Sequence, residues 1–365
     1  MKFKSERDIL VEALSAASRV VGTRNIGATS GLLLNLVGNQ LVVTGTDLDL
    51  TVRTTVDVIG IEDGSVVVPA KLIVDAIRSL EPGAVTINTT DENVEISLGR
   101  ARFNLRTFSV LDYPKLPPVA GPVAQIPASE LLGALNQVVR AAATDDTRPL
   151  LTGVLFTHHE GVLRLVATDS YRLAFRDVTG VGPLSTNDLL VPARALTELQ
   201  RSAGSTNPEA TVGVTLTDSE VCFVVGGTSI ASRLIDGNYP SVMQLIPASY
   251  PNQIRIAKDT LITSLRRAKL LANDTTSSVR LTVQDKSVEV RTASSDRGQI
   301  DDHVDADYSG EEITIAFNPN FLIDGIEAVN GDEVLLEISD AVRPAMVRSV
   351  DDDSFRYLLM PVRVQ

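Results

Sequence analysis

Residues 150–176 read LLTGVLFTHHEGVLRLVATDSYRLAFR: an apolar run, a turn, a second apolar run, and then a Thr-Asp step. The chain repeats this order at residues 31–53 (GLLLNLVGNQLVVTGTDLDLTVR) and again at residues 278–297 (SVRLTVQDKSVEVRTASSDR). The polar steps that end the three runs lie 122 and then 127 residues apart: Thr46-Asp47, Thr168-Asp169 and Ser295-Asp296. Because solenoid repeats are much shorter, this period predicts a tandem array of whole domains.

Amphipathic segments surround the three strand pairs. Apolar residues at helical spacing predict helices over residues 6–21, 70–80, 127–144, 192–202, 257–272 and 319–329. Each repeat therefore offers two helices for about eight short strands, without long βαβ alternation, and this predicts an α+β class with mostly antiparallel sheets. Exposed sheet edges predict pairing between neighbouring repeats, and edge-to-edge copies that curve and close into a ring would leave no free edge.

The domain boundaries follow from composition. Prolines crowd residues 112–127, which suits a semi-rigid connector, and Tyr113-Pro114 precedes it just as Tyr239-Pro240 precedes the second connector. At 365 residues, the chain has room for three domains of ordinary size. We expect them at residues 1–118, 119–250 and 251–365.

Composition excludes several classes of protein. With 44% hydrophobic and 22% charged residues, and no apolar run near membrane-helix length, we expect a soluble globular protein. The N-terminus is too charged for a secretory signal, and one cysteine, Cys222, excludes an internal disulfide. These features favour the cytoplasm, with Cys222 as a buried apolar residue.

Signs of catalysis are few. The nucleotide-binding, zinc-protease, paired-cysteine and serine-hydrolase motifs are absent, so we expect no enzyme activity, no metal and no cofactor. His158-His159 precedes a hairpin turn, and the run at 351–353 reads as a solvated hairpin tip. Repetition at Asp47, Asp169 and Asp296 favours a turn role for these carboxylates, the alternative being a metal-dependent hydrolase or nuclease.

Charge is distributed unevenly. The formal net charge is −13, which argues against a protein that binds nucleic acid over its whole surface. The six predicted helical segments together carry +2, however, so that −15 lies on strands and loops. If the helices shared one surface, that surface could face a polyanion; ordinary solvated helix faces are the alternative.

The motifs together resemble a known family. Over its full length the chain resembles the bacterial DNA polymerase sliding clamp, the beta subunit of the replicative polymerase. The matching pieces, in family order, are the opening MKF, TGTDLDL, VPAKL, FNLRTF followed by Tyr113-Pro114, TRPLLTGVLF, VATDSYRLA, VPARAL, LIDGNYP and YLLMPVR.

The resemblance implies a head-to-tail homodimer whose six similar domains close a ring. Helices would line the hole, and duplex DNA would pass through without sequence readout. The ring would tether the catalytic subunit of the replicative polymerase, and the clamp loader and repair proteins would bind through short peptide motifs. The alternative is a peptide-binding adaptor that does not encircle DNA.

For DNA contact, the resemblance carries over Arg24 and, in the corresponding loop of the second domain, Arg148. Residues 25–28 lack the proline-containing run usual after that first arginine. Further candidates come from the predicted helices and could instead form ion pairs with neighbours: Lys71, Arg140, Arg194, Arg201, Arg266 and Arg267.

The family's peptide-binding pocket has aliphatic and methionine walls that accept leucine and phenylalanine side chains. Gln244 stands where some relatives carry an arginine. The resemblance places in this pocket Leu151, Thr168, Ser170, Tyr171, Arg172, Leu173, Pro240, Leu245, Pro344, Leu358, Met360, Pro361, Val362 and Arg363.

The family's dimer joins the first domain of one protomer to the third domain of the other. Polar and apolar residues alternate strictly along the strand at 100–106, and three arginines lie on its polar face. This pattern is typical of an exposed edge strand that pairs with another chain. A solvated edge is the alternative. The residues implied at the dimer interface are Arg100, Arg102, Phe103, Leu270, Leu271, Asp301, Asp302 and Asp305.

Overall fold

The computed structural model describes residues 1–22, 26–90, 92–116, 123–182, 184–204, 210–247, 249–272, 278–294 and 297–363. The chain forms two compact units. The first unit consists of Met1–Ser129 with Arg194–Leu234, and the second of Glu130–Ala193 with Ile235–Gln365. Strand pairing in the described ranges is antiparallel throughout, as predicted from the lack of βαβ alternation.

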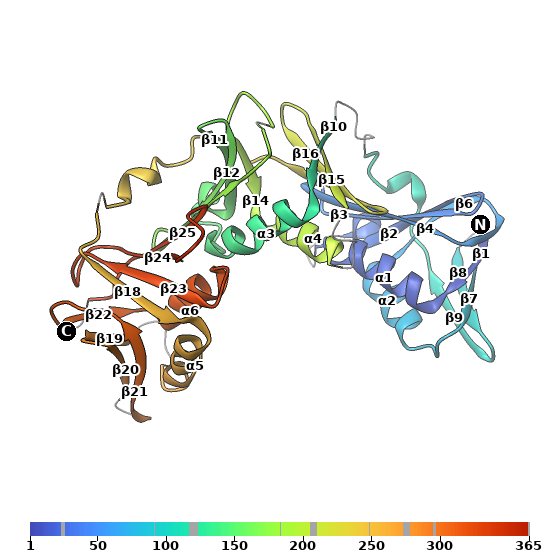
Figure 1. The fold of residues 1–365 in the computed structure, drawn as a ribbon. Helices are drawn as coiled ribbons and strands as arrows, with labels where there is room; N and C mark the ends of the chain where they lie inside the picture. The colour runs from blue at the N-terminus through green and yellow to red at the C-terminus, as the bar shows by residue number, and fades with distance from the viewer. Residues whose placement is uncertain are drawn as a thin grey trace. The chain divides into compact units, whose positions relative to one another are not determined.

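The first unit contains two sheets with helices α1 (Arg7–Ser18), α2 (Ala70–Arg78) and nearly all of α4 (Ala193–Ala203) (Figure 1). The five-stranded sheet runs β5 (Ile59–Glu62), β1 (Lys2–Glu6), β7 (Ala84–Thr89), β8 (Asn93–Leu98) and β9 (Ala101–Arg106). The eight-stranded sheet runs β10 (Val123–Pro127), β15 (Thr211–Leu216), β16 (Glu220–Val225), β17 (Thr228–Arg233), β4 (Leu50–Asp57), β3 (Gln40–Thr46), β2 (Gly31–Val37) and β6 (Gly64–Pro69). The first unit also contains two short 3-10 helices, η1 (Gly27–Ser30) and η2 (Val110–Asp112).

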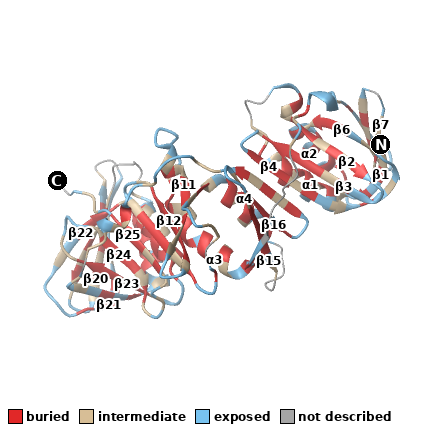
Figure 2. Ribbon diagram, turned by 90° about the horizontal axis from the view of Figure 1, so that it is seen from above, coloured by how far each residue is buried: buried red, intermediate tan, exposed pale blue. Residues whose placement is uncertain are grey.

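The core of this unit lies between the two helices and the sheets. Leu10 and Leu14 of α1 and Ile73 and Ile77 of α2 are buried, because apolar residues three and four positions apart fall on one helix face. They pack in one cluster with Phe3 from β1. Figure 2 shows the buried residues concentrated in the sheets and along α1 and α2. Burial of each such side chain stabilises the folded state by about 1.5–3 kcal/mol relative to leaving it exposed to water.

The second unit is built on one twelve-stranded sheet with helices α3 (Ala128–Val138, mostly in this unit), α5 (Lys258–Lys269) and α6 (Pro319–Ala328) (Figure 1). The strand order is β14 (Leu189–Pro192), β11 (Gly153–His159), β12 (Val162–Thr168), β13 (Arg172–Val178), β25 (Phe355–Leu359), β24 (Ala345–Ser349), β23 (Glu333–Ile338), β18 (Asn252–Ala257), β21 (Gly298–Asp307), β20 (Ser287–Ser294), β19 (Val279–Gln284) and β22 (Ile313–Phe317). The 3-10 turns are η3 (Val139–Ala141), η4 (Pro149–Thr152) and η5 (Val242–Leu245).

Strands from neighbouring sequence repeats pair with each other, as the exposed edges predicted. In the first unit β17 pairs with β4, and the hydroxyls of Thr228 and Thr54 lie 3.2 Å apart across the seam. In the second unit β13 pairs with β25, from Arg172 opposite Leu359 to Arg176 opposite Phe355. Each seam satisfies backbone groups that an edge strand would leave unpaired.

The repeated aspartates shape turns, which confirms the turn role predicted for two of them. The Oδ1 atom of Asp169 accepts from the backbone N–H groups of Tyr171 (2.9 Å) and Arg172 (3.0 Å). Asp47 makes the same pair of bonds one repeat earlier. The residue after each aspartate has positive φ, 78° at Ser170. The third step, Ser295-Asp296, lies outside the described residues.

Two local expectations need correction. The helix predicted over 127–144 ends at Val138 and tightens into η3, because the adjacent β-branched residues Val138 and Val139 favour helix continuation poorly. The acidic run at 351–353 is not simply solvated. Asp352 pairs with Arg176 at 2.7 Å, and Asp353 pairs with Arg356.

Two further features are consistent with the composition. Cys222 is buried in β16 and burial raises the pKa of its thiol to about 11, so it is a packing residue. Among the described helices, none combines the length and the apolar character needed to cross a membrane.

Two helical glycines give a test of the packing. Gly325 of α6 faces the buried ring of Tyr357, and a Cβ there would overlap that ring. Gly133 of α3 is exposed, and a Cβ there meets nothing within 4 Å. We expect Gly325→Ala to lower the free energy of unfolding by about 1–3 kcal/mol through overpacking. Gly133→Ala should raise it by about 0.5–1 kcal/mol through helix propensity.

Denaturant unfolding followed by circular dichroism measures both effects. Equal stabilisation by the two substitutions would show that Tyr357 is free to move away from α6, contrary to its close packing here.

Candidate functional site

The second unit contains a largely apolar cavity of about 220 Å³ beside the start of β13. We call it the Tyr171 cavity. Its walls come from four stretches of chain: η4, the turn between β12 and β13, the segment around η5, and the end of β25. The residues that line it are Leu151, Thr168, Ser170, Tyr171, Arg172, Leu173, Pro240, Val242, Leu245, Leu358 and Met360.

Hydrogen bonds fix the turn on one side of the Tyr171 cavity. The hydroxyl of Thr168 donates to the carbonyl of Arg172 (2.6 Å) and accepts from the N–H of Ser170 (3.1 Å). The N–H of Met360 donates to the carbonyl of Tyr171 at 2.9 Å, which ties the turn to the end of β25. Since these bonds are short and local, the turn is held in place before any ligand arrives.

The segment leading to η5 is anchored to the same turn. The N–H of Thr168 donates to the hydroxyl of Tyr239 at 3.0 Å. Burial raises the pKa of Tyr239 far above its ordinary value, although the hydrogen bond from Thr168 opposes this, so the phenol stays neutral. Pro240, Val242 and Leu245 then follow along the cavity wall.

The cavity has a buried floor and an exposed rim. Leu173, Val242 and Leu358 are buried and belong to one apolar cluster that also contains Phe175 and Met346. At the rim, by contrast, Tyr171 is 62% exposed, Leu245 60% and Met360 42%. Large apolar groups exposed around a buried apolar floor are typical of a site that accepts aliphatic or aromatic side chains.

Arg172 holds three parts of the second unit together. Its guanidinium, with only 10% of the side chain exposed, lies 2.9 Å from Asp169 and 2.5 Å from Asp324 of α6. It also donates to the Tyr357 hydroxyl at 3.4 Å and stacks 4.4 Å above the ring of Phe321. Burial opposes the charge, but the hydroxyl and the two carboxylates outweigh burial and raise the pKa of Arg172. The ring of Tyr171 stacks on the same Phe321, with centroids 6.2 Å apart.

Ten of the fourteen residues predicted for the pocket line the Tyr171 cavity. Pro344, Pro361 and Val362 are half-buried and Arg363 is exposed, and these four do not line it. Val242 also lines the cavity, although it was not predicted from the sequence. Its position between Pro240 and Leu245, two predicted pocket residues, could have indicated it. Gln244 is exposed on η5. The peptide-binding role of these residues stays a prediction.

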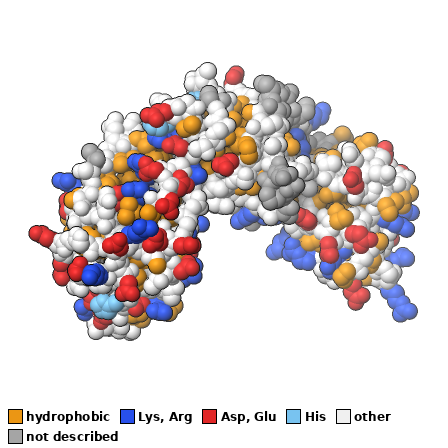
Figure 3. Space-filling view, viewed as in Figure 1, with side chains coloured by type: hydrophobic (Ala, Val, Ile, Leu, Met, Phe, Trp, Pro, Cys, Tyr) orange, Lys and Arg blue, Asp and Glu red, His pale blue; other side chains and the backbone are white. Residues whose placement is uncertain are grey.

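In the first unit, the basic candidates for DNA contact lie on exposed helix positions. Lys71 is exposed on α2. Arg194 and Arg201, both on α4, form ion pairs with Asp47 and with Glu198, and Glu198 also binds Arg19 at 2.7 Å. Arg24 lies outside the described residues. Figure 3 shows Lys and Arg side chains gathered over the region of α1 and α2.

In the second unit, acids and bases alternate on the visible surface (Figure 3). Arg140 and Arg266 share one carboxylate, that of Glu327 on α6, at 3.3 and 2.8 Å. Burial opposes ionisation of Glu327, but hydrogen bonds from these two arginines outweigh it and lower the pKa of the carboxyl. Arg267 pairs with Asp302 at 2.9 Å, and Arg148 donates to the Ser170 hydroxyl at 2.8 Å.

Most of the residues predicted for the dimer interface lie on or beside two strand edges. β9 is the last strand of the five-stranded sheet, with Arg100 and Arg102 exposed and Phe103 half-buried. In the second unit β18 covers only the end of β21, at Ala306 and Asp307, so residues 298–305 have no described partner on that side.

The acidic and apolar residues expected opposite β9 lie in the second unit. Leu270, just after α5, is 75% exposed, and Leu271 is half-buried. Asp301 pairs with Arg291 at 3.1 Å, Asp302 pairs with Arg267, and Asp305 is exposed.

Within the described ranges, groups of three or more His, Cys, Asp or Glu side chains that could hold a metal ion do not occur. The Tyr171 cavity joins an apolar floor to a fixed backbone turn and one buried guanidinium. Apolar pockets with a few fixed polar groups are typical of sites that accept extended peptides.

Comparison with known proteins agrees with the sequence motifs. Residues 1–117, 125–241 and 243–363 match the N-terminal, central and C-terminal domains of the DNA polymerase III beta subunit. The "Beta sliding clamp" of Streptomyces coelicolor is 32% identical over 384 aligned residues, covering 100% of both chains. That of Staphylococcus aureus is 30% identical, covering 100% of this chain and 99% of the relative.

Solved structures give the same result. The sliding clamp of Bartonella birtlesii bound to griselimycin has a TM-score of 0.92 at 29% identity, and that of Bacillus subtilis 0.90 at 29%; both comparisons cover 100% of each chain. These similarities confirm the family that the sequence motifs indicated. They also confirm the predicted α+β clamp fold.

Removal of the Arg172 side chain tests its role in the second unit. Arg172→Ala leaves the carboxylate of Asp169, whose side chain is 13% exposed, without its guanidinium and removes the cation that stacks on Phe321. We expect the free energy of unfolding to fall by about 3–5 kcal/mol. Arg343→Ala is the control, because Arg343 is an exposed arginine paired three residues away with Asp340, and it should cost less than about 1 kcal/mol.

Urea unfolding of the two variants provides the comparison. Similar small losses in both would mean that Arg172 does not hold the turn, α6 and β25 together.

Proposed function

Because the chain belongs to the DNA polymerase III beta subunit family, the beta sliding clamps, we propose that it forms a homodimeric ring that encircles duplex DNA and tethers the replicative polymerase. Members of this family are non-catalytic processivity factors. In this proposal the ring slides without reading sequence, and polymerase, clamp loader and repair proteins dock through short peptides.

The Tyr171 cavity is the observation that carries the tethering role. Its floor of Leu173, Val242 and Leu358 is buried, while Tyr171, Leu245 and Met360 are exposed at the rim. An extended peptide with leucine or phenylalanine would bury both its own side chains and this rim. A soluble protein gains little from exposing so much apolar surface unless a partner covers it.

The state of the arginines supports DNA encirclement rather than tight DNA binding. Arg140, Arg194, Arg201, Arg266 and Arg267 each pair with a carboxylate. Paired cations release few counterions from DNA, so phosphate contact is weak and its salt dependence shallow. A ring that holds DNA topologically has no need of stronger attraction, and weak contact permits sliding.

Two free strand edges support the dimer. Arg102 of β9 and Arg100 in the turn before it are exposed cations, and the open stretch of β21 presents Asp301 and Asp305. Antiparallel pairing of β9 with β21 of another copy would satisfy both edges and bring opposite charges together. The exposed Leu270 would supply apolar contact beside that seam.

A peptide-binding adaptor that does not encircle DNA is the second candidate. It is favoured by the net charge of −13 and by the fact that the Tyr171 cavity is complete within the second unit. Retention on circular DNA separates the two functions.

The double substitution Leu245→Ser with Met360→Ser tests tethering apart from encirclement. Both proteins are assembled on nicked circular plasmid without a loader, by separating the protomers and letting the dimer re-form around the plasmid, because the loader would dock on the same cavity. They are then washed in high salt and tested before and after the plasmid is cut. We expect wild type and variant to stay on the circle and leave the linear form. Primer extension should stay processive only with wild type, because the variant lacks two apolar rim residues.

Loss of wild type from circular and linear plasmid alike would contradict the ring and favour the adaptor. Full processivity of the variant would contradict the role of the Tyr171 cavity in tethering.

Glu327→Gln tests whether paired arginines keep DNA contact weak. The substitution leaves Arg140 and Arg266 without their shared carboxylate. We expect the variant to bind a short linear duplex more tightly than wild type. The slope of log binding constant against log salt concentration should be steeper by about 1–2, since each added phosphate contact contributes about 0.9 to it. Fluorescence anisotropy of a labelled duplex, recorded over a series of salt concentrations, measures the affinity and its salt slope.

Glu333→Gln is the matched control. It removes the same charge but frees Arg255 of β18, which is not among the predicted DNA contacts. Equal effects of the two substitutions would assign the change to net charge alone.

A further inference from the structure

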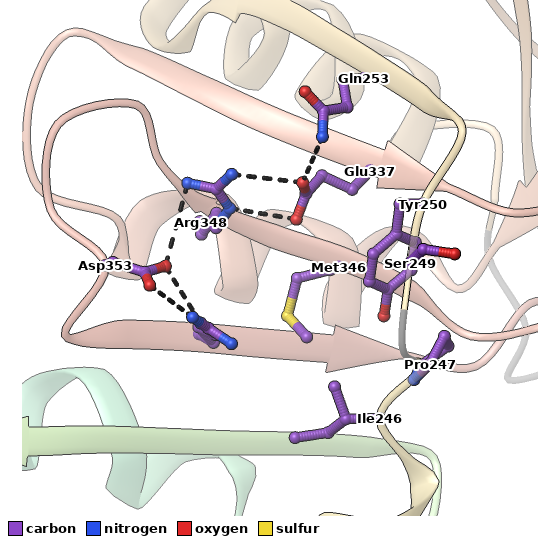
Figure 4. Close-up of a pocket in the computed structure, with 10 residues that line it drawn as sticks. Ile246, Pro247, Ser249, Tyr250, Gln253, Glu337, Met346, Arg348 and Asp353 are labelled. Atoms are coloured by element: carbon purple, nitrogen blue, oxygen red, sulfur yellow. Dashed lines mark hydrogen bonds and ion pairs between the residues drawn. The ribbon is translucent and has the colours of Figure 1, made fainter.

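A second cavity of about 380 Å³ lies in the second unit, over strands β23, β24 and β25 and beside the segment that follows η5 (Figure 4). We call it the Tyr250 cavity. Ile246, Pro247, Ser249 and Tyr250 form one side, and side chains from the three strands, from β18 and from the turn before β25 form the other. None of its lining residues lines the Tyr171 cavity.

One wall of the Tyr250 cavity is apolar. Met346 is buried in β24, and Ile246 and Tyr250 pack against the same cluster that forms the floor of the Tyr171 cavity. Figure 4 shows Met346, Ile246 and Tyr250 converging on the space between the strands and the 246–250 segment. This wall has room for an aliphatic side chain of a ligand.

The opposite wall contains two arginines with different partners. Arg348 binds Glu337 through two hydrogen bonds, of 3.0 and 3.2 Å, and Gln253 donates to the same carboxylate at 3.1 Å. Glu337 is buried, so these three donors satisfy a charge that could not remain unpaired. This pair is part of the fixed frame of the cavity.

The second carboxylate, Asp353, is held differently. It accepts from Arg356 at 3.0 Å and lies 3.9 Å from Arg348, so that two guanidinium groups converge on it (Figure 4). Its side chain is 61% exposed and belongs to the turn between β24 and β25. An exposed ion pair of this kind contributes little stability. A carboxylate from another molecule could therefore take its place at small cost.

A buried hydroxyl adds a further polar group. The Oη atom of Tyr250 is buried and has no hydrogen-bond partner among the described residues. Burial, helped by the nearby charge of Glu337, raises the pKa of Tyr250 to about 12. The phenol is therefore protonated at neutral pH and can donate to a backbone carbonyl of a ligand.

From this geometry we propose that the Tyr250 cavity is a second peptide-binding site, which takes a segment of a partner protein that carries one glutamate or aspartate beside an aliphatic residue. An aliphatic side chain would pack against Met346 and Ile246, and a nearby glutamate or aspartate would replace Asp353 between Arg348 and Arg356. The site is separate from the Tyr171 cavity, so a partner could engage it whether or not the chain encircles DNA.

The surrounding charges favour a peptide over nucleic acid. Asp351 is exposed and Asp352 half-buried in the same turn as Asp353, and Glu337 lies inside the cavity. This density of carboxylates repels a polyanion, whereas a single peptide carboxylate needs only the two converging guanidinium groups.

The test compares Asp353→Asn with Asp351→Asn in the full-length protein. The probes are acetylated, amidated hexapeptides in which leucine and glutamate are adjacent or separated by one glycine, and their glutamine analogues. Binding is measured by saturation-transfer NMR. We expect Asp353→Asn to bind a glutamate peptide about five- to tenfold more tightly than wild type, since it removes the competing carboxylate.

Asp351→Asn makes the same charge change in the same turn and should bind as wild type does. Arg356→Gln should weaken binding of the glutamate peptide to the level of its glutamine analogue. Tyr171→Ala, which alters only the other cavity, should have no effect on this binding.

Three results would overturn the proposal. Equal affinity of Asp353→Asn and Asp351→Asn would mean that Asp353 does not compete. Loss of binding in Tyr171→Ala would move the peptide to the Tyr171 cavity. Displacement of the peptide by a twelve-nucleotide single strand would assign the two arginines to phosphate instead.

Discussion

The buried guanidinium of Arg172 is the interaction on which the second unit depends. It connects the Asp169 turn, helix α6 through Asp324 and strand β25 through Tyr357, three elements far apart in the chain. A charge this well buried is stable only when its partners are complete, so the three elements must come together or not at all. The Tyr171 cavity exists because this constraint holds its turn against the end of β25.

The two cavities share one apolar cluster. Leu173, Val242 and Leu358 face the Tyr171 cavity, while Met346 and Ile246 face the Tyr250 cavity. Pro240, Val242 and Leu245 line the Tyr171 cavity, and the residues that follow, Ile246 and Pro247, line the Tyr250 cavity. Close-packed clusters transmit small displacements, so a peptide in one cavity has a physical path to affect the other. The proposed tethering site and the proposed carboxylate-binding site are thus neighbours in the second unit.

Carboxylates neutralise most of the arginines that sequence alone would assign to DNA. Asp47, Glu198, Asp302 and Glu327 each hold one or more of them. With a net charge of −13, the chain therefore leaves few of these arginines available for strong contact with phosphate. In the proposed ring, weak contact with phosphate would let the protein remain on DNA yet move along it. The topological closure proposed here would supply the retention that electrostatics does not.

The sequence by itself determined the repeats, the six helices within a few residues, the antiparallel α+β class and the aspartate turns, because helical spacing and short-range hydrogen bonds are local. Ten of fourteen pocket residues also came from motifs. Only the tertiary structure decided that Val242 lines the Tyr171 cavity, that Arg172 meets Asp324 across 152 residues, and that Asp353 lies between two arginines. The physical reason is that these contacts depend on which strand edges pair, and no local pattern records that choice.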